Sequence, residues 1–88
     1  MKLKYDVFVS EMGENFVGVV VGSGIRAHRG LLKMNATGAS ILEKLREEIS
    51  EQELVDKMVK EYPGETVDTV SEVVRGFVEK LKDAELVE

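Results

Sequence analysis

The chain has 88 residues and no cysteine, and its formal net charge is −5, with 43% hydrophobic and 33% charged side chains. This length allows one small domain with a single core, and the absence of cysteine excludes disulfide bonds and thiolate zinc sites. No apolar run approaches the roughly 20 residues that a membrane-spanning helix needs.

Charge is unevenly distributed along the chain. Residues 1–34 carry five basic and three acidic side chains, whereas residues 35–88 carry seven basic and fourteen acidic ones, a net charge of −7. Proteins that bind nucleic acids draw most of their sequence-independent affinity from neutralised phosphates. The acidic second part therefore argues against a nucleic-acid partner.

Three stretches have the pattern of β-strands. Residues 5–10 alternate apolar and polar side chains, residues 16–21 are almost continuously apolar and rich in valine, and a third strand is predicted over residues 27–34. Turns are expected at residues 12–15 and 22–24, where glycine and asparagine are frequent. Because residues 16–21 are apolar on both faces, we expect this strand to be central. Phe8, on the second face of the sheet, is expected to be partly covered.

The pattern changes at Asn35, after which apolar residues recur every three or four positions. This spacing predicts helices over residues 36–47, 51–62 and 67–83. Each predicted helix follows a side chain that can accept hydrogen bonds from the first free backbone N–H groups. These side chains belong to Asn35, to Ser50, with Glu53 completing a capping box, and to Thr66.

The order of the elements predicts an α+β fold. We expect one domain over residues 1–88, with an N-terminal three-stranded antiparallel sheet followed by a three-helix bundle of winged helix-turn-helix type. Strands that follow one another in a meander leave the third strand at an edge of the sheet. Such an edge exposes unpaired backbone N–H and C=O groups.

No motif in the sequence predicts catalysis. His28 is the single histidine of the chain, and without cysteines or suitably spaced carboxylates it does not predict a metal site. The acidic residues between positions 47 and 53 flank a helix junction and a capping box, which explains them without acid–base chemistry. Gly22 and Gly24 lack the wider fingerprint of a phosphate-binding loop. We therefore predict a non-enzyme with no cofactor and no metal.

The junction between the third strand and the first helix resembles that of a known family. The stretch Leu32–Leu45, LKMNATGASILEKL, resembles the PqqD family, the peptide chaperones of pyrroloquinoline quinone (PQQ) biosynthesis, and the wider set of recognition elements for ribosomally made precursor peptides. Ile49–Met58 resembles the second helix of the family. Two features depart from its pattern: residues 47–49 replace a common Asp-Gly, and no cysteine lies near the first helix.

The resemblance implies both a fold and a function. It implies three strands followed by three helices, and a domain that binds the leader segment of a precursor peptide and presents it to a modifying enzyme, often a radical S-adenosylmethionine (radical SAM) enzyme. The leader adds as a strand to the third strand, in a groove beside the third helix. The predicted peptide-binding residues are Arg29, Leu31, Leu32, Lys33 and Met34 on the strand and Val67, Val70, Val73 and Val74 on the helix.

Basic residues gather near this edge in the sequence. Arg26, Arg29 and Lys33 lie on or near the predicted third strand. Opposite charges across an interface favour binding. We therefore hypothesise that the bound peptide carries acidic residues opposite these side chains.

Two other functions stay open at this point. A winged-helix DNA-binding regulator fits the order of the helices, although Asp68, Glu72 and Glu79 oppose the few basic residues of the third helix. The other possible function is that of a structural domain, which forms a homodimer by pairing with a second copy through its third strand. Since no signal-peptide core follows the first six residues, we expect a soluble protein of the cytoplasm.

Overall fold

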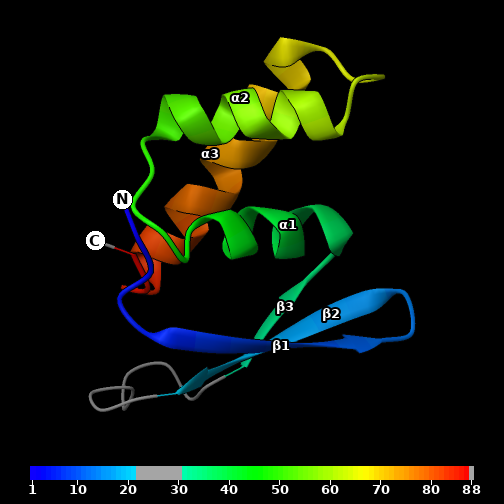
Figure 1. The fold of residues 1–88 in the computed structure, drawn as a ribbon. Coiled ribbons are helices and arrows are strands. Elements are labelled where there is room, and N and C mark those ends of the chain that lie inside the picture. Colours follow the sequence, from blue (N-terminus) through cyan, green and yellow to red (C-terminus); the bar gives the residue numbers. More distant parts are fainter. Residues whose placement is uncertain (22–30, 88) are drawn as a thin grey trace.

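The computed structural model describes residues 1–21 and 31–87 of the chain. In this part, strands β1 (Asp6–Met12), β2 (Asn15–Val21) and β3 (Leu31–Met34) form one antiparallel sheet in the order β1-β2-β3. Helices α1 (Ala36–Lys44), α2 (Glu51–Glu61) and α3 (Val67–Asp83) follow, and all three lie on one side of the sheet (Figure 1). The predicted α+β order of strands and helices is confirmed. The predicted start of the third strand and the turn at residues 22–24 lie outside the described residues.

The first hairpin is longer than the periodicity predicts. Pairing between β1 and β2 continues to Met12 and Asn15, and Gly13 in the turn has a φ angle of +67°. Glycine adopts this left-handed conformation without steric cost. A two-residue turn can therefore close the hairpin. β2 pairs with β1 on one side and with β3 on the other, so it is the central strand, as expected.

Helix α1 ends at Lys44 instead of continuing to residue 47. A helix that continued through residue 48 would form a hydrogen bond from the Ile49 amide to the Leu45 carbonyl. The N-terminal segment takes both groups: the Leu3 amide donates to the Leu45 carbonyl at 2.9 Å, and the Ile49 amide donates to the Met1 carbonyl at 3.0 Å. The helix therefore stops where a segment distant in the sequence competes for its backbone.

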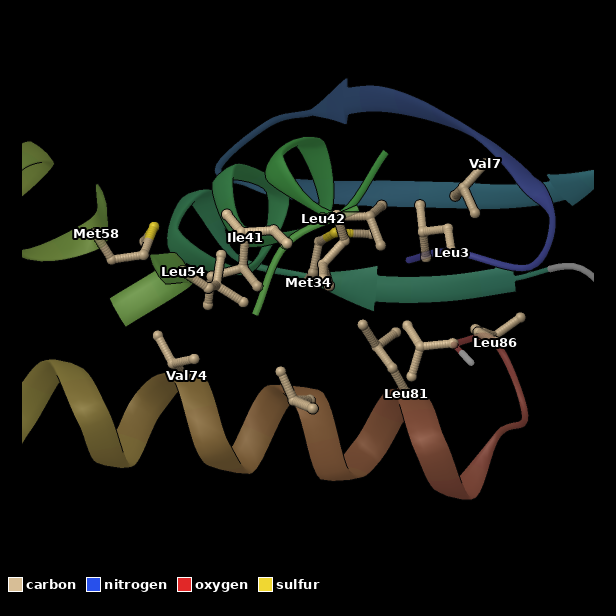
Figure 2. Close-up of a cluster of buried hydrophobic side chains, with 14 of the residues drawn as sticks. Leu3, Val7, Met34, Ile41, Leu42, Leu54, Met58, Val74, Leu81 and Leu86 are labelled. Carbon is tan, nitrogen blue, oxygen red and sulfur yellow. The ribbon is translucent and has the colours of Figure 1, made fainter. Parts of the chain in front are cut away.

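The helix-facing side of the sheet forms the core together with the helices. Val7, Val20, Leu32 and Met34 are buried on this side. Figure 2 shows side chains of α3, among them Val74 and Leu81, pointing towards Ile41 and Leu42 of α1. The two ends of the chain also join here, because Leu3 pairs with Val87 and the Lys4 amide donates to the Leu86 carbonyl at 2.8 Å.

Two glycines let the layers approach each other closely around Met34. A Cβ atom on Gly18 would lie 2.8 Å from Val7 Cγ1 and 2.9 Å from Met34 Cε. A Cβ atom on Gly38 would lie 2.9 Å from Phe77 Cε1 and 3.1 Å from Met34 Cβ. Both positions are too crowded for a side chain, so β2 and α1 each contribute a bare backbone surface to this contact.

The opposite face of the sheet is exposed, which corrects the expectation for Phe8. Its side chain is 67% exposed, and it pairs across the strands with Val19, which is 40% exposed. The helices all follow β3 and pack on the other side, so within the described residues they cover one face only. An apolar pattern on both faces thus identified the central strand but did not indicate a second covering layer.

The predicted helix caps are present. The Gly38 amide donates to Asn35 Oδ1 at 2.9 Å, and the Thr69 amide donates to Thr66 Oγ1 at 3.1 Å. Ser50 and Glu53 form the predicted capping box. Its hydrogen bonds, first that of the Ser50 backbone amide, lower the pKa of Glu53.

A polar contact joins α1 to α2. Ser40 Oγ donates to Glu61 Oε2, and Lys44 Nζ donates to the same oxygen at 2.9 Å. These hydrogen bonds, that of Ser40 first, hold the pKa of Glu61 below its usual value. No helix in residues 1–21 and 31–87 is both long enough and apolar enough to cross a membrane.

We predict opposite effects of alanine at two glycines. Gly18→Ala forces overpacking against Val7 and Met34, which costs about 1–3 kcal/mol and outweighs the roughly 0.5–1 kcal/mol that alanine gains over glycine. A Cβ on Gly76 of α3 meets nothing within 4 Å, so Gly76→Ala stabilises by up to about 1 kcal/mol. Urea denaturation of both variants checks this; a stabilised Gly18→Ala would contradict the crowding.

We also predict a pH dependence from Glu61. A carboxyl group whose pKa is lowered by folding stabilises the protein above its unfolded pKa, and this contribution is lost as the pH falls through the folded pKa. Glu61→Gln should therefore unfold at a lower temperature than the wild type at pH 7, and the gap should close on acidification. Thermal melts from pH 7 to pH 3 measure this effect. Glu72→Gln, at an exposed position of α3, serves as the control, and its melting temperature should follow that of the wild type at each pH.

Candidate functional site

The two edges of the sheet differ in what covers them. At the edge formed by β1, the Arg46 guanidinium donates to the Val7 carbonyl at 2.6 Å. Glu43 holds the same guanidinium, with 3.0 Å between Arg46 Nε and Glu43 Oε1. Arg46, just after the end of α1, therefore occupies a backbone group of β1 that an added strand would otherwise use.

The edge formed by β3 is open in the described part of the chain. β3 pairs with β2 from Leu31, opposite Val19, to Met34, opposite Phe16. Among residues 1–21 and 31–87, no other strand and no side chain forms a hydrogen bond with β3 on its far side. An edge strand presents one row of free N–H and C=O groups, and here that row remains available.

A basic hollow lies beside the end of β3, against α3. It has a volume of about 360 Å³ and is lined by Asn15, Lys33, Met34, Asn35, Phe77 and Lys80. Met34 and the half-buried Phe77 form its apolar walls, and the exposed residues Lys33 and Lys80 also line it. We call this feature the basic hollow.

An apolar hollow continues from the basic hollow at Asn35, which lines both. It has a volume of about 300 Å³ and lies among the start of α1, the end of α2 and the first half of α3. Its apolar walls are Met58, Tyr62, Val70, Val73 and Val74, and its polar rim is Asn35, Thr37, Glu65 and Thr69. Both hollows lie against α3 and share Asn35, and we refer to them together as the groove.

Of the predicted strand residues, Lys33 and Met34 line the groove. Leu32 and Met34 are buried beneath the sheet, and of these only Met34 lines a hollow. Lys33 is exposed and pairs with Val17, so its side chain lies on the open face of the sheet. Leu31 reaches the open edge through its backbone, paired with Val19. Arg29, together with Arg26 and His28, lies outside the described residues.

Of the predicted helix residues, some line the apolar hollow and one does not. Val70 and Val74 are buried walls of the apolar hollow, whereas Val73 is 45% exposed and its side chain faces the open space. Val67 is 57% exposed and lines neither hollow. The apolar stripe of α3 therefore serves the core for most of its length, and Val73 is its part that faces the groove.

Sequence reasoning missed Phe77 and Lys80 as groove residues. Neither is among the predicted peptide-binding residues. Val73, Phe77 and Lys80 follow the i, i+4, i+7 spacing of one helix face. The structure shows why that face stays open: Gly38 leaves room for the Phe77 ring, so α3 packs against α1 with this side next to the groove.

A larger hollow of about 490 Å³ lies at the other edge of the sheet, around Arg46. It is lined mainly by polar and charged residues, and Arg46 there is already bound to the Val7 carbonyl and to Glu43. No group of three His, Cys, Asp or Glu side chains in the described residues is placed to hold a metal ion. The groove at β3 is therefore the better candidate site.

An antiparallel sheet with one open edge, next to a grooved helix, defines a class of domains that bind an extended peptide as an additional strand. The family model described as "Coenzyme PQQ synthesis protein D (PqqD)" matches residues 25–87, and the chain belongs to this family.

A solved structure described as "TbiB1 in Complex with the TbiA(beta) Leader Peptide" is similar to this chain with a TM-score of 0.71 and 26% sequence identity. The similarity covers 100% of this chain and 95% of that one. A comparison with curated proteins finds no match.

We predict that Asn35 acts mainly as a helix cap. Asn35→Ala removes the hydrogen bond to the Gly38 amide, and the free energy of unfolding should fall by about 1 kcal/mol. Asn35→Ser keeps a capping oxygen and should recover most of this loss. Urea denaturation of both variants measures the difference. An equal loss in both would show that Asn35 stabilises the fold by another contact.

Proposed function

We propose that this domain binds the leader segment of a ribosomally made precursor peptide by adding it as a strand to β3. It then presents the peptide to a modifying enzyme, a radical SAM enzyme, in the cytoplasm. In this role the protein contributes binding and no catalysis.

The difference between the two sheet edges is the observation that carries this proposal. Arg46 covers part of the β1 edge, whereas the β3 edge has no such contact in the described residues. A peptide on β3 gains main-chain hydrogen bonds from the edge and side-chain contacts from the groove along α3. The same side of the molecule thus offers both affinity and selectivity.

The leader-bound structure supports the kind of partner. TbiB1 was solved with a leader peptide, and its fold corresponds to this chain over nearly the full length of both. The family description, coenzyme PQQ synthesis, supports a place in a pathway that modifies a peptide. The resemblance of Leu32–Leu45 to the PqqD junction supports the handover to an enzyme.

Displayed peptides test the proposal without knowledge of the natural precursor. Random 16-residue peptides on phage are selected against the immobilised protein, and enriched peptides are synthesised. We expect binding to slow hydrogen exchange at β3 amides and to shift the amide resonances of Val73 and Phe77. Failure to enrich any peptide, or binding mapped to β1 or to the exposed face at Phe8, would overturn the proposal.

Matched valine variants separate the groove from the rest of the surface. Val73→Gln places an amide in the apolar hollow, and the loss of one apolar contact should weaken peptide binding about tenfold or more. Val19→Gln changes an equally exposed valine on the other face of the sheet. It should leave the affinity unchanged. Fluorescence anisotropy with a selected peptide measures both affinities.

A further inference from the structure

The open face of the sheet, which the helices leave bare (Figure 1), is apolar at its centre. Phe8 of β1 and Val19 of β2 are exposed and lie opposite each other. Val17 lies on the same face, because alternate side chains of a strand share a face, and it is half-buried. Exposed apolar side chains that cluster together mark an interaction surface, whereas single ones do not. These three side chains therefore define the apolar centre of the open face.

Two opposite charges lie at corners of the open face. Asp6 is paired with Val21, and Lys33 is paired with Val17, so both charged side chains lie on the same face as Val19. Both are exposed, and neither forms an ion pair within residues 1–21 and 31–87. Val19 lies halfway between them, because it is one strand across and two residues along from each. At about 4.8 Å between strands and 3.4 Å per residue, each charge is roughly 8 Å from this centre.

This arrangement of charges is complementary to a second copy of itself. In a symmetric dimer, residue i of one copy meets residue j of the other, and j meets i. A twofold axis over Val19, at right angles to the line from Asp6 to Lys33, places Asp6 of each copy over Lys33 of the other. It also places Phe8 over Val17 and Val19 of the other copy. One face therefore supplies two ion pairs and a covered apolar centre.

The spacing of packed sheets allows these contacts. Face-to-face sheets lie about 10 Å apart, a distance that an aspartate and a lysine side chain span together. Under this axis the strands of the two copies cross at a steep angle, nearer to the orthogonal than to the aligned class of sheet packing. Because the acidic and the basic corner cancel, the open face does not select a partner of high net charge. A copy of the same face offers both complementary groups.

The size of the open face sets the strength of this association. From Asp6 to Met12 the face extends about 20 Å along the strands, and it is about 10 Å wide across the three strands. This is well below the roughly 800 Å² that each partner buries in an interface of standard size. A contact of this size is typical of weak, reversible association.

We propose that two copies of this domain associate through the open face of their sheets as a weak symmetric dimer. Val19 lies at the twofold axis, and Asp6 of each copy forms an ion pair with Lys33 of the other. The free backbone groups of β3 and the groove along α3 take no part in this contact. The dimer therefore presents two separate edges for strand addition, which a dimer through β3 would consume.

Exchange of the two charges tests the proposal by sedimentation velocity, at protein concentrations from about 10 μM to about 1 mM, the range of weak association. In a dimer of Asp6→Lys, both ion pairs become pairs of lysines, and in a dimer of Lys33→Glu both become pairs of acidic residues. Each variant alone should therefore dimerise at least tenfold more weakly than the wild type. An equimolar mixture of the two variants restores both opposite pairs, and it should associate as strongly as the wild type.

Matched variants control for net charge and for folding. Glu72→Lys and Lys60→Glu change the net charge by the same amounts at exposed positions of α3 and α2, and they should leave association near that of the wild type. Val19→Gln, at the axis, should weaken association, whereas Val73→Gln, on the groove, should not. Circular dichroism confirms that every variant is folded.

Three results would overturn the proposal. The first is a wild type that stays monomeric across this range of concentration. The second is a dimer that Asp6→Lys and Lys33→Glu weaken without recovery in their mixture, or that Val19→Gln leaves intact. The third is association that slows hydrogen exchange at the β3 amides, since the two copies would then pair through that edge. None of these measurements uses a peptide, so their outcome is independent of the proposed function.

Discussion

The packing of Met34 is the constraint on which the rest of the structure depends. This side chain lies between a glycine of β2 and a glycine of α1, and the ring of Phe77 lies against the second glycine. Strand, helix and groove are therefore joined at one point. Any side chain larger than hydrogen at Gly18 or Gly38 would push apart layers that bury much of the core. The position of α3 relative to β3, and hence the width of the groove, follows from these two small residues.

Most of the fold could be predicted from the sequence because its signals are local. Helix caps at Asn35, Ser50 and Thr66 depend on side chains next to the backbone groups they bind, and all three are present. The end of α1 could not be predicted in this way. The carbonyl of its C-cap residue, Leu45, accepts a hydrogen bond from the Leu3 amide, more than forty residues earlier, and no local pattern contains that contact.

The candidate site shows the same difference between local signals, which the sequence reveals, and contacts between distant segments, which it does not. The apolar stripe of α3 indicated which face of this helix packs against the rest of the protein. Periodicity alone does not separate a buried valine from one that lines a groove. Val74 is fully buried and its neighbour Val73 is 45% exposed. The place of Lys80 beside β3 was also hidden, because it depends on how α3 packs against the sheet. Pairings between elements require the three-dimensional structure, and they decide what a surface can recognise.

The guanidinium of Arg46 binds a backbone carbonyl of β1, whereas no side chain in the described residues binds the β3 edge. The sheet therefore offers one edge for the addition of a strand. A sheet with two free edges can grow in both directions, which is how β-proteins assemble into long polymers. Here Arg46 occupies one carbonyl of the β1 edge, which hinders the addition of a strand at that edge. A second copy that paired with β3 would occupy the place proposed for the peptide, so the two forms of association would exclude each other. The protein concentration and the peptide concentration would then set which of the two is populated.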